Sequence, residues 1–170
     1  MDTTFEEILE KYQASIMSFI YRYVGNLSDA DDLTQEVFIS VYKNLDKLRD
    51  KDKAKSWIFS IAANKSKNFL RRKKIMSFLS LDDSNSREEG LKLEDVLDSK
   101  EESRQKVLER EEEIKNILSS LPNRQKEILL LRGEGFDVKE IAELLDISEG
   151  TVKANLHFAR QKAGKTAEEL

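Results

Sequence analysis

The 170-residue chain contains no cysteine, one proline and only six glycines. Without cysteine it can form neither a disulfide nor a thiolate metal site, which is compatible with a reducing compartment. The single histidine, His157, has no second histidine or cysteine to complete a metal site. We therefore expect no metal or cofactor and, because a glycine-rich phosphate loop is also missing, no catalytic activity. Scarce proline and glycine favour an all-α fold.

Long apolar segments are missing as well. The N-terminal stretch MDTTFEEILEKY is acidic and lacks an apolar core, so we expect no signal peptide. No apolar run approaches the ~18 residues that span a bilayer, which predicts a soluble, cytoplasmic protein. The pattern favours two small helical domains joined by a flexible acidic linker. Their expected ranges are 1–76 for the N-terminal domain, 77–106 for the linker and 107–170 for the C-terminal domain.

Basic and acidic residues are segregated along the chain, although the net charge is only −4. From Lys43 to Lys74 there are twelve basic residues and three acidic ones, whereas acids outnumber bases from Asp82 to Glu113. Because local fields steer binding to phosphate, this distribution permits a DNA-binding half. A solvated helix face explains the same charges equally well.

Apolar residues recur at helical spacing in three N-terminal stretches, and we predict helices over 5–24, 29–45 and 54–74. Ser28 or Asp29 is expected to cap the second helix, and residues 46–53 form a charged loop. One side of the second helix is an apolar stripe. Its other side carries Asp32, Gln35, Glu36, Ile39 and Tyr42. Isolated apolar residues are common on protein surfaces, but this face could also dock another protein.

The third helix combines an expected core face with a polar stripe. The core positions are Ile58, Ile61, Ala62 and Phe69, and the stripe consists of Ser60, Asn64, Lys67, Asn68 and Arg71, with Trp57 beside its start. Amide and basic side chains next to an aromatic ring can hold phosphates and stack or hydrogen-bond unpaired bases. Trp57 could equally belong to the core.

The linker has broken periodicity, with room for a short helical turn near residues 91–97. Helices are predicted again over 107–121 and 124–132, on either side of Pro122. Two further helices then follow around a turn at Asp146-Ile147-Ser148. Asp137 and Glu140 match a capping box before the first, Ser148 caps the second, and Ile147 is expected to be buried between them.

The last helix has the features of a DNA-reading helix. Its expected core face is Val152, Leu156, Ala159 and Ala163, and the opposite face carries Gly150, Ala154, His157 and Gln161. Lys153 and Arg160 flank this face on one side, and Thr151 and Phe158 lie toward the other. Small residues permit close approach to the major groove, polar ones reach base edges and cations hold phosphates. A plain helical hairpin without DNA contacts is the alternative.

In this order, the segments DADDLTQEVFISVYKNL, WIFSIAANKSKNFLRRKK, LPNRQKEILLLR and EIAELLDISEGTVKANLHFARQKA resemble bacterial RNA polymerase sigma factors of the extracytoplasmic-function family. The resemblance covers nearly the whole chain. It implies two helical domains that connect core RNA polymerase to promoter DNA, with no catalysis. It also implies an anti-sigma factor, often membrane-anchored, which would hold the chain at the membrane.

The resemblance assigns roles to three groups of residues. The group matching the helix that docks on the clamp helices of the polymerase's largest subunit is Asp32, Gln35, Glu36 and Ile39. The group matching the −10 element surface is Leu48, Trp57 and Asn64 for a flipped base, with Lys67, Arg71 and Arg72 for the strand backbone. The group matching −35 contacts is Arg132, Lys153, Ala154, His157 and Arg160.

The chain also departs from that family's pattern. Asn155 and Phe158 stand where the family commonly has arginine, Ala154 where it often has serine, and Asn68 where aspartate is frequent. Fewer phosphate contacts are then available to the last helix. A conventional helix-turn-helix regulator acting at an operator is the alternative function, and a helical adaptor that binds only proteins is a third.

Overall fold

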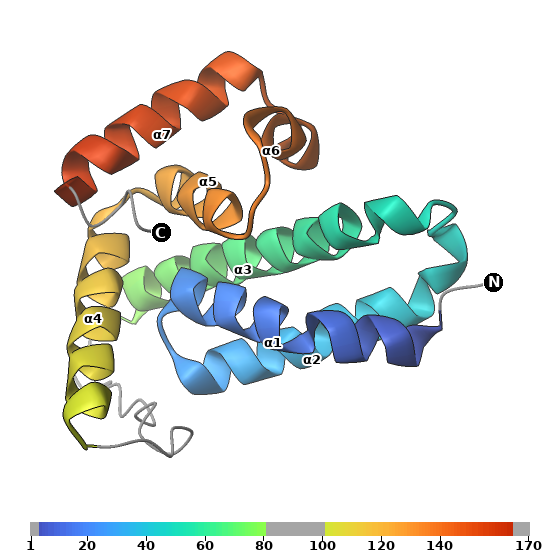
Figure 1. The fold of residues 1–170 in the computed structure, drawn as a ribbon, viewed down its shortest axis with the longest axis horizontal. Coiled ribbons are helices and arrows are strands. Elements are labelled where there is room, and N and C mark those ends of the chain that lie inside the picture. Colours follow the sequence, from blue (N-terminus) through green and yellow to red (C-terminus); the bar gives the residue numbers. More distant parts are fainter. Residues whose placement is uncertain (1–3, 81–100, 165–170) are drawn as a thin grey trace.

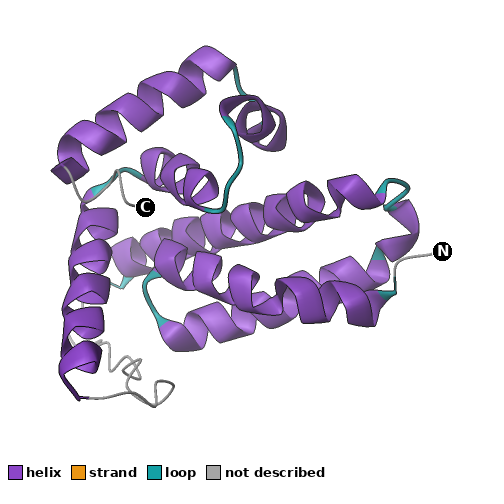
Figure 2. Cartoon of the chain, in the orientation of Figure 1, coloured by secondary structure: helices purple, strands orange, loops and turns teal. Residues whose placement is uncertain are grey.

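The computed structural model describes residues 4–80 and 101–164, without the side chains of 101–104. Every regular element in these ranges is an α-helix or a 3₁₀ turn, so the all-α prediction is confirmed (Figures 1 and 2). The helices are α1 (Phe5–Val24), α2 (Leu27–Lys43), α3 (Ala54–Leu79), α4 (Glu101–Ser120), α5 (Asn123–Gly133), α6 (Val138–Leu145) and α7 (Glu149–Ala163). None of these described helices is long and apolar enough to cross a membrane.

The first three helices form one bundle. In Figure 1, α1, α2 and α3 lie below α5, α6 and α7, while α4 runs along one side. A capping box between Thr4 and Glu7 starts α1, and Gly25 ends it with a left-handed φ of 80°. The expected α1 bounds are confirmed. Apolar faces of the three helices meet in a core that includes Ile16, Phe19, Ile20, Leu33, Val37, Val41, Ile58 and Ala62.

Several expected boundaries in this bundle were wrong. Helix α2 begins at Leu27 because the Asn26 side chain, not Ser28 or Asp29, accepts the hydrogen bond from the Asp29 amide at 2.9 Å. The charged loop contains two 3₁₀ turns, η1 (Leu45–Lys47) and η2 (Lys51–Lys53). Two helices are longer than expected on the linker side. Helix α3 continues past residue 74 to Leu79, and α4 starts at Glu101 instead of residue 107. Residues 75–80 contain neither proline nor glycine that could stop α3 at Lys74. The linker segment 81–100, including the proposed turn near 91–97, lies outside the described residues.

The second bundle is built around α5. Pro122 precedes this helix, and Ile128, Leu129, Leu130 and Leu131 are all buried. Four consecutive buried residues do not fit a helix with a single apolar face. The reason is that α5 contacts α1, α6 and α7, which cover it on several sides.

The two bundles pack against each other, and their buried side chains form one continuous apolar cluster. Phe59 of α3 lies between Phe19 of α1 and Phe136 of the α5–α6 loop, with ring centroids 5.3 and 5.4 Å away. This contact explains why Phe59 is fully buried although its position was not on the expected core face. Ile61 and Phe69, which were expected in the core, are only half-buried.

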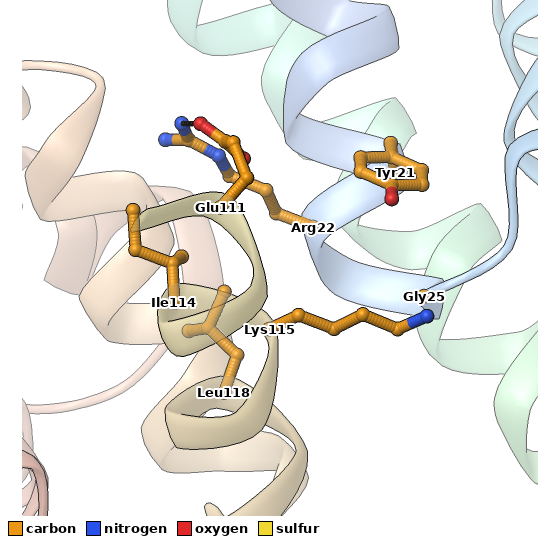
Figure 3. A pocket seen from close by; sticks show the side chains of 7 residues that line it. All are labelled: Tyr21, Arg22, Gly25, Glu111, Ile114, Lys115 and Leu118. Atoms are coloured by element: carbon orange, nitrogen blue, oxygen red, sulfur yellow. Dashed lines mark hydrogen bonds and ion pairs between the residues drawn. The ribbon is translucent and has the colours of Figure 1, made fainter. Parts of the chain in front are cut away.

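Charged side chains reinforce the contact between the bundles. The Arg22 guanidinium at the end of α1 meets the Glu111 carboxylate of α4 at 3.2 Å. Figure 3 shows this pair at a small pocket that is lined by Tyr21, Arg22, Gly25, Glu111, Ile114, Lys115 and Leu118. Its walls come from the end of α1 and from α4, so this pocket lies where these two helices meet.

Three lysines each donate a hydrogen bond to a backbone carbonyl at the C-terminal end of another helix. Lys126 donates to the Tyr23 carbonyl at the end of α1, and Lys55 donates to the Glu134 carbonyl that ends α5. Lys162 of α7 donates to the Ser120 carbonyl at the end of α4. A cation at a helix C-terminus satisfies a free carbonyl and offsets the negative end of the helix dipole. The first two of these bonds join the two bundles.

One carboxyl group is buried at the contact. Glu127 of α5 is almost completely buried, and one of its oxygens accepts a hydrogen bond from Arg124 at 3.0 Å. Burial raises the pKa of Glu127 above its usual value, because the lost hydration outweighs the opposing charges of Arg124 and Lys67. The neighbouring Tyr23 hydroxyl is also buried, and its pKa is raised mainly by burial. Ionisation of Glu127 is therefore expected to weaken the contact between the bundles.

Candidate nucleic-acid and polymerase interfaces

Helices α6 and α7 form the expected helix-turn-helix. In the capping box, the Glu140 amide donates to Asp137 at 2.8 Å and the Asp137 amide donates to Glu140 at 2.7 Å. Asp146 ends α6 with φ 54°, the only positive φ of a non-glycine residue in the described ranges. Asparagine and aspartate tolerate this conformation better than other side chains, which allows the tight turn. Ser148 then caps α7 by accepting from the Thr151 amide at 3.1 Å.

Helix α7 buries one face and exposes the other. Val152, Leu156 and Ala159 are buried as expected, while Ala163 is half-buried. Ile147 in the turn packs against the core but is only half-buried, so the expectation that it is buried was wrong. The solvent-exposed residues of the helix include Gly150, Thr151, Lys153, Ala154, His157, Phe158, Arg160 and Gln161. The face of α7 predicted to point outward, with Gly150, Ala154, His157 and Gln161, is therefore confirmed to be exposed.

The two cations of this face are available to a ligand. Neither Lys153 nor Arg160 forms an ion pair with any residue in the described ranges. Arg132 at the end of α5 is also exposed, although one of its nitrogens donates to the Phe136 carbonyl at 3.0 Å. Two further side chains of α7 are engaged: Asn155 donates to the Thr151 carbonyl at 2.8 Å, and Lys162 holds Ser120. Phosphate or base contacts would come mainly from the Lys153, His157 and Arg160 side.

The polar stripe of α3 is exposed toward its C-terminal end. Asn64, Asn68, Arg71 and Arg72 are exposed, whereas Lys67 is half-buried. Trp57 is half-buried against the core. Part of its ring therefore packs in the core, and the rest remains accessible beside the polar stripe. Leu48 is half-buried just after η1 and contacts the same core. An open surface hollow is lined by Glu36, Lys65, Asn68, Arg71 and Arg72. Three basic side chains make this hollow suitable for a phosphate backbone.

The outer face of α2 is exposed throughout. Asp32, Gln35 and Glu36 are exposed, as is Ile39 at 53%. Tyr42 is 68% exposed and packs edge-on against Phe5, with ring centroids 5.3 Å apart. Glu36 joins this face to the basic hollow through its ion pair with Lys65 at 3.3 Å. A mixed acidic and apolar surface of this kind suits a protein partner.

Sequence reasoning missed a group of apolar residues at the end of α3. Ile75, Met76, Phe78 and Leu79 are all exposed there. The signal was present, because IMSFL continues the helix with apolar residues and without a breaker. In the described ranges no group of three or more histidine, cysteine or carboxylate side chains is placed to hold a metal ion.

Comparison with known proteins assigns both bundles to one family. Residues 8–75, which span most of α1 to α3, match the family model described as Sigma-70 region 2. Residues 111–162, which run from the middle of α4 to near the end of α7, match Sigma-70, region 4. The two matches lie in the order expected from the resemblance and cover the candidate surfaces on α2, α3 and α7.

Whole-chain relatives agree. The chain is 30% identical to the ECF RNA polymerase sigma factor SigW of Bacillus subtilis (strain 168), over 98% of this chain and 90% of the relative. It is also 30% identical to the ECF RNA polymerase sigma-E factor of Escherichia coli (strain K12), over 92% of this chain and 83% of that protein.

A solved structure shares the fold. The sigma factor RpoE of Bartonella quintana, in complex with the anti-sigma factor NepR, has a TM-score of 0.71 at 19% identity, over 96% of both chains. The matched regions, the whole-chain relatives and the common fold all point to the same conclusion. The chain belongs to the extracytoplasmic-function family of RNA polymerase sigma factors, and it directs promoter-specific initiation of transcription by that polymerase.

Proposed function

We propose that the three exposed surfaces divide the work of initiation between them. The outer face of α2 docks on the clamp helices of the polymerase's largest subunit, through Asp32, Gln35, Glu36 and Ile39. The α3 stripe reads the −10 element, and the outward face of α7 reads the −35 element. The observation that carries this proposal is that one chain exposes an acidic and apolar face of α2 next to a basic hollow and, separately, a helix-turn-helix.

The −35 contacts use the polar side of α7. Lys153 and Arg160, which share one flank of α7, hold phosphates, and His157 beside them reaches a base edge. Ala154 permits close approach because its side chain is small and exposed. Arg132 supports the contact from the end of α5. With only three cations in this set, duplex binding by the isolated chain is weak.

The −10 contacts use α3 and the loop before it. Trp57, Asn64 and Leu48 form the surface that captures a flipped base, while Lys67, Arg71 and Arg72 bind the strand backbone. Unstacking a base costs about a few kcal/mol, and contacts with the half-buried Trp57 ring and the exposed Asn64 amide offset part of this cost. Polymerase docking and the −35 contacts contribute the remaining free energy.

Membership of the sigma factor family also suggests how the chain is regulated and where it is located. We propose that the chain is cytoplasmic and is restrained by an anti-sigma factor, because a sigma factor of the same fold has been solved with one. A membrane-anchored inhibitor would hold the chain at the membrane. We propose no catalytic role for any residue, since chemistry belongs to the polymerase.

In vitro transcription with purified core polymerase tests this function. The chain is added to core enzyme and a randomised promoter library, and the transcripts are sequenced. The expected result is initiation from one class of promoters with two conserved elements, absent when either protein is omitted. Unchanged transcripts with and without the chain would contradict the proposal, and would favour a regulator acting at an operator.

A further inference from the structure

Phe158 is an exposed aromatic residue on the helix that is proposed to read DNA. Its side chain is 56% exposed, whereas Leu156 and Ala159 of the same helix are buried. The ring touches only His157 among aromatic neighbours, at a centroid distance of 5.8 Å and an angle of 65°. It is absent from the apolar cluster that holds the domain together. Packing within the chain therefore does not account for this phenylalanine.

The exposure is unusual within this domain. In the described residues 105–164, only Val107 and Phe158 are large hydrophobic residues with exposed side chains. Val107 lies in α4, away from the helix-turn-helix, so Phe158 is the aromatic group that this face presents to solvent. Leaving a large apolar side chain in water gains no burial free energy unless a ligand covers it.

On the side of Phe158 away from His157 and Gln161, free hydrogen-bond donors are few. Helical spacing places Ala154 one turn before it and Lys162 one turn after it on the same side of α7. Ala154 has no polar side-chain atom, and Lys162 is directed to the Ser120 carbonyl. Asn155, on the same flank, donates to the carbonyl of Thr151 in its own helix. The polar side chains on this flank of α7 are therefore engaged within the chain, while Lys153 and Arg160 make the other flank basic.

The major groove of B-form DNA offers one apolar group to such a surface, the 5-methyl group of thymine. We propose that Phe158 contacts a thymine methyl in the −35 element and is a specificity-determining residue of this sigma factor. The inference rests on the proposed role of α7 in reading the −35 element. Removing one buried methyl group is expected to weaken binding about fourfold.

Uracil substitution tests this contact atom by atom, because deoxyuridine lacks only the methyl group. Holoenzyme is assembled from core polymerase and the full chain, and its preferred −35 sequence is found by selection from a promoter library. Each thymine of that element, on both strands, is then replaced singly by deoxyuridine, and affinity is measured in a competition assay. The wild type should lose about fourfold at one thymine or two adjacent ones.

Variants assign the effect to the residue. Phe158→Ala should bind the thymine and uracil promoters equally at that position, and Phe158→Leu should keep part of the preference because it remains apolar. His157→Ala should lower affinity for both promoters while keeping their ratio. Uracil substitutions outside the −35 element should leave the wild-type affinity unchanged. Thermal unfolding monitored by circular dichroism verifies that the Phe158 variants are folded.

Other outcomes overturn the inference. These are a preferred −35 element without thymine, no response of the wild type to uracil at any position, and the same response in Phe158→Ala. Failure of the proposed function is distinct from these. It would show as a chain that gives core polymerase no sequence-dependent binding to any promoter, which overturns the inference together with the function.

Discussion

The ring of Phe136 packs edge-on against the ring of Phe59, with centroids 5.4 Å apart and planes inclined at 72°. Phe136 lies in the loop before the helix-turn-helix and Phe59 lies in α3, so the pair joins the DNA-reading domain to the first bundle. Both rings are buried. The Lys55 ammonium lies 4.7 Å from the Phe136 ring centroid and also binds the end of α5. The two domains are thereby held in a closed arrangement.

Replacing Phe136 by alanine is expected to destabilise the chain by about 3–5 kcal/mol, because the truncation removes a buried aromatic side chain and leaves a cavity. Urea unfolding followed by circular dichroism measures this loss. Phe158→Ala is the matched control, since it removes the same atoms from an exposed position and should change stability by less than about 0.5 kcal/mol. Similar losses in the two variants would show that Phe136 does not support the closed arrangement.

The closed arrangement does not fit the proposed reading of both promoter elements by one chain. Helix α7 packs on α6 and α6 packs on α3, so the axes of α3 and α7 approach each other to within about 20 Å, or two helix-packing distances. Elements about 25 base pairs apart are separated by about 85 Å of B-form DNA, at ~3.4 Å per base pair. We therefore expect that a chain locked in the closed form cannot initiate transcription.

The absence of native cysteine makes this prediction testable by cross-linking. Cysteines replace Lys55 and Glu134, which lie on the two sides of the contact, and a short cleavable bifunctional maleimide joins them. The cross-linked chain should lose promoter-specific transcription and regain it after cleavage. The same reagent on each single-cysteine variant controls for modification alone. Full activity of the cross-linked chain would mean that the domains need not separate.

The buried carboxyl group of Glu127 gives the stability a pH dependence of known sign. Because burial raises its pKa in the folded chain, the folded state keeps a proton that the unfolded state has released. The free energy of unfolding should therefore fall as the pH rises from the ordinary carboxyl pKa through the raised one. Glu127→Gln removes this contribution, so the variant should gain stability relative to the wild type over that window.

Urea unfolding at a series of pH values measures the difference between the two chains. Glu112→Gln, which replaces an exposed carboxylate in α4, is the matched control and should follow the wild type. A constant difference between Glu127→Gln and the wild type across the window would mean that Glu127 has the same pKa in the folded and unfolded chains.

Two further substitutions separate docking from DNA opening. The Asn64 side chain is exposed and forms no hydrogen bond within the described residues, so Asn64→Ala should impair initiation at least tenfold without weakening polymerase binding. Asp32→Arg reverses a charge on the exposed face of α2 and should do the opposite, lowering affinity for core polymerase at least tenfold. Polymerase affinity is measured by co-purification and fluorescence anisotropy, and initiation by abortive transcription. Equal loss of both activities in Asn64→Ala would make Asn64 a structural residue.

Local signals in the sequence predicted most helices well. The bounds of α1 follow from its apolar spacing and Gly25, and the capping box at Asp137 marks the start of α6. Asn26, Ser28 and Asp29 are all residues that can cap a helix, and they lie within four positions of one another. The sequence did not show that Asn26 is the one that caps α2. The end of α3 was placed too early, because apolar residues after Lys74 continue a helix without giving it a core face.

Contacts between the domains were beyond sequence reasoning. Phe59 was off the expected core face, yet it is buried because the partner ring of Phe136 comes from 77 residues further along the chain. The burial of Glu127 has the same origin, since α1 covers its helix. Periodicity identifies one apolar face of a helix, whereas α3 and α5 are each covered on more than one side. The exposure of the outer face of α2 and of the outward face of α7 did follow from helical spacing, whereas Leu48, Trp57 and Lys67 are half-buried.

Promoter binding with and without core polymerase tests the central claim most directly. Fluorescence anisotropy measures the affinity of a labelled promoter duplex for the chain alone and for the chain with core polymerase, at one fixed salt concentration. The account predicts weak binding with little sequence preference by the chain alone, and a tight, sequence-specific complex once core polymerase is present. Tight, sequence-specific binding by the chain alone would contradict it.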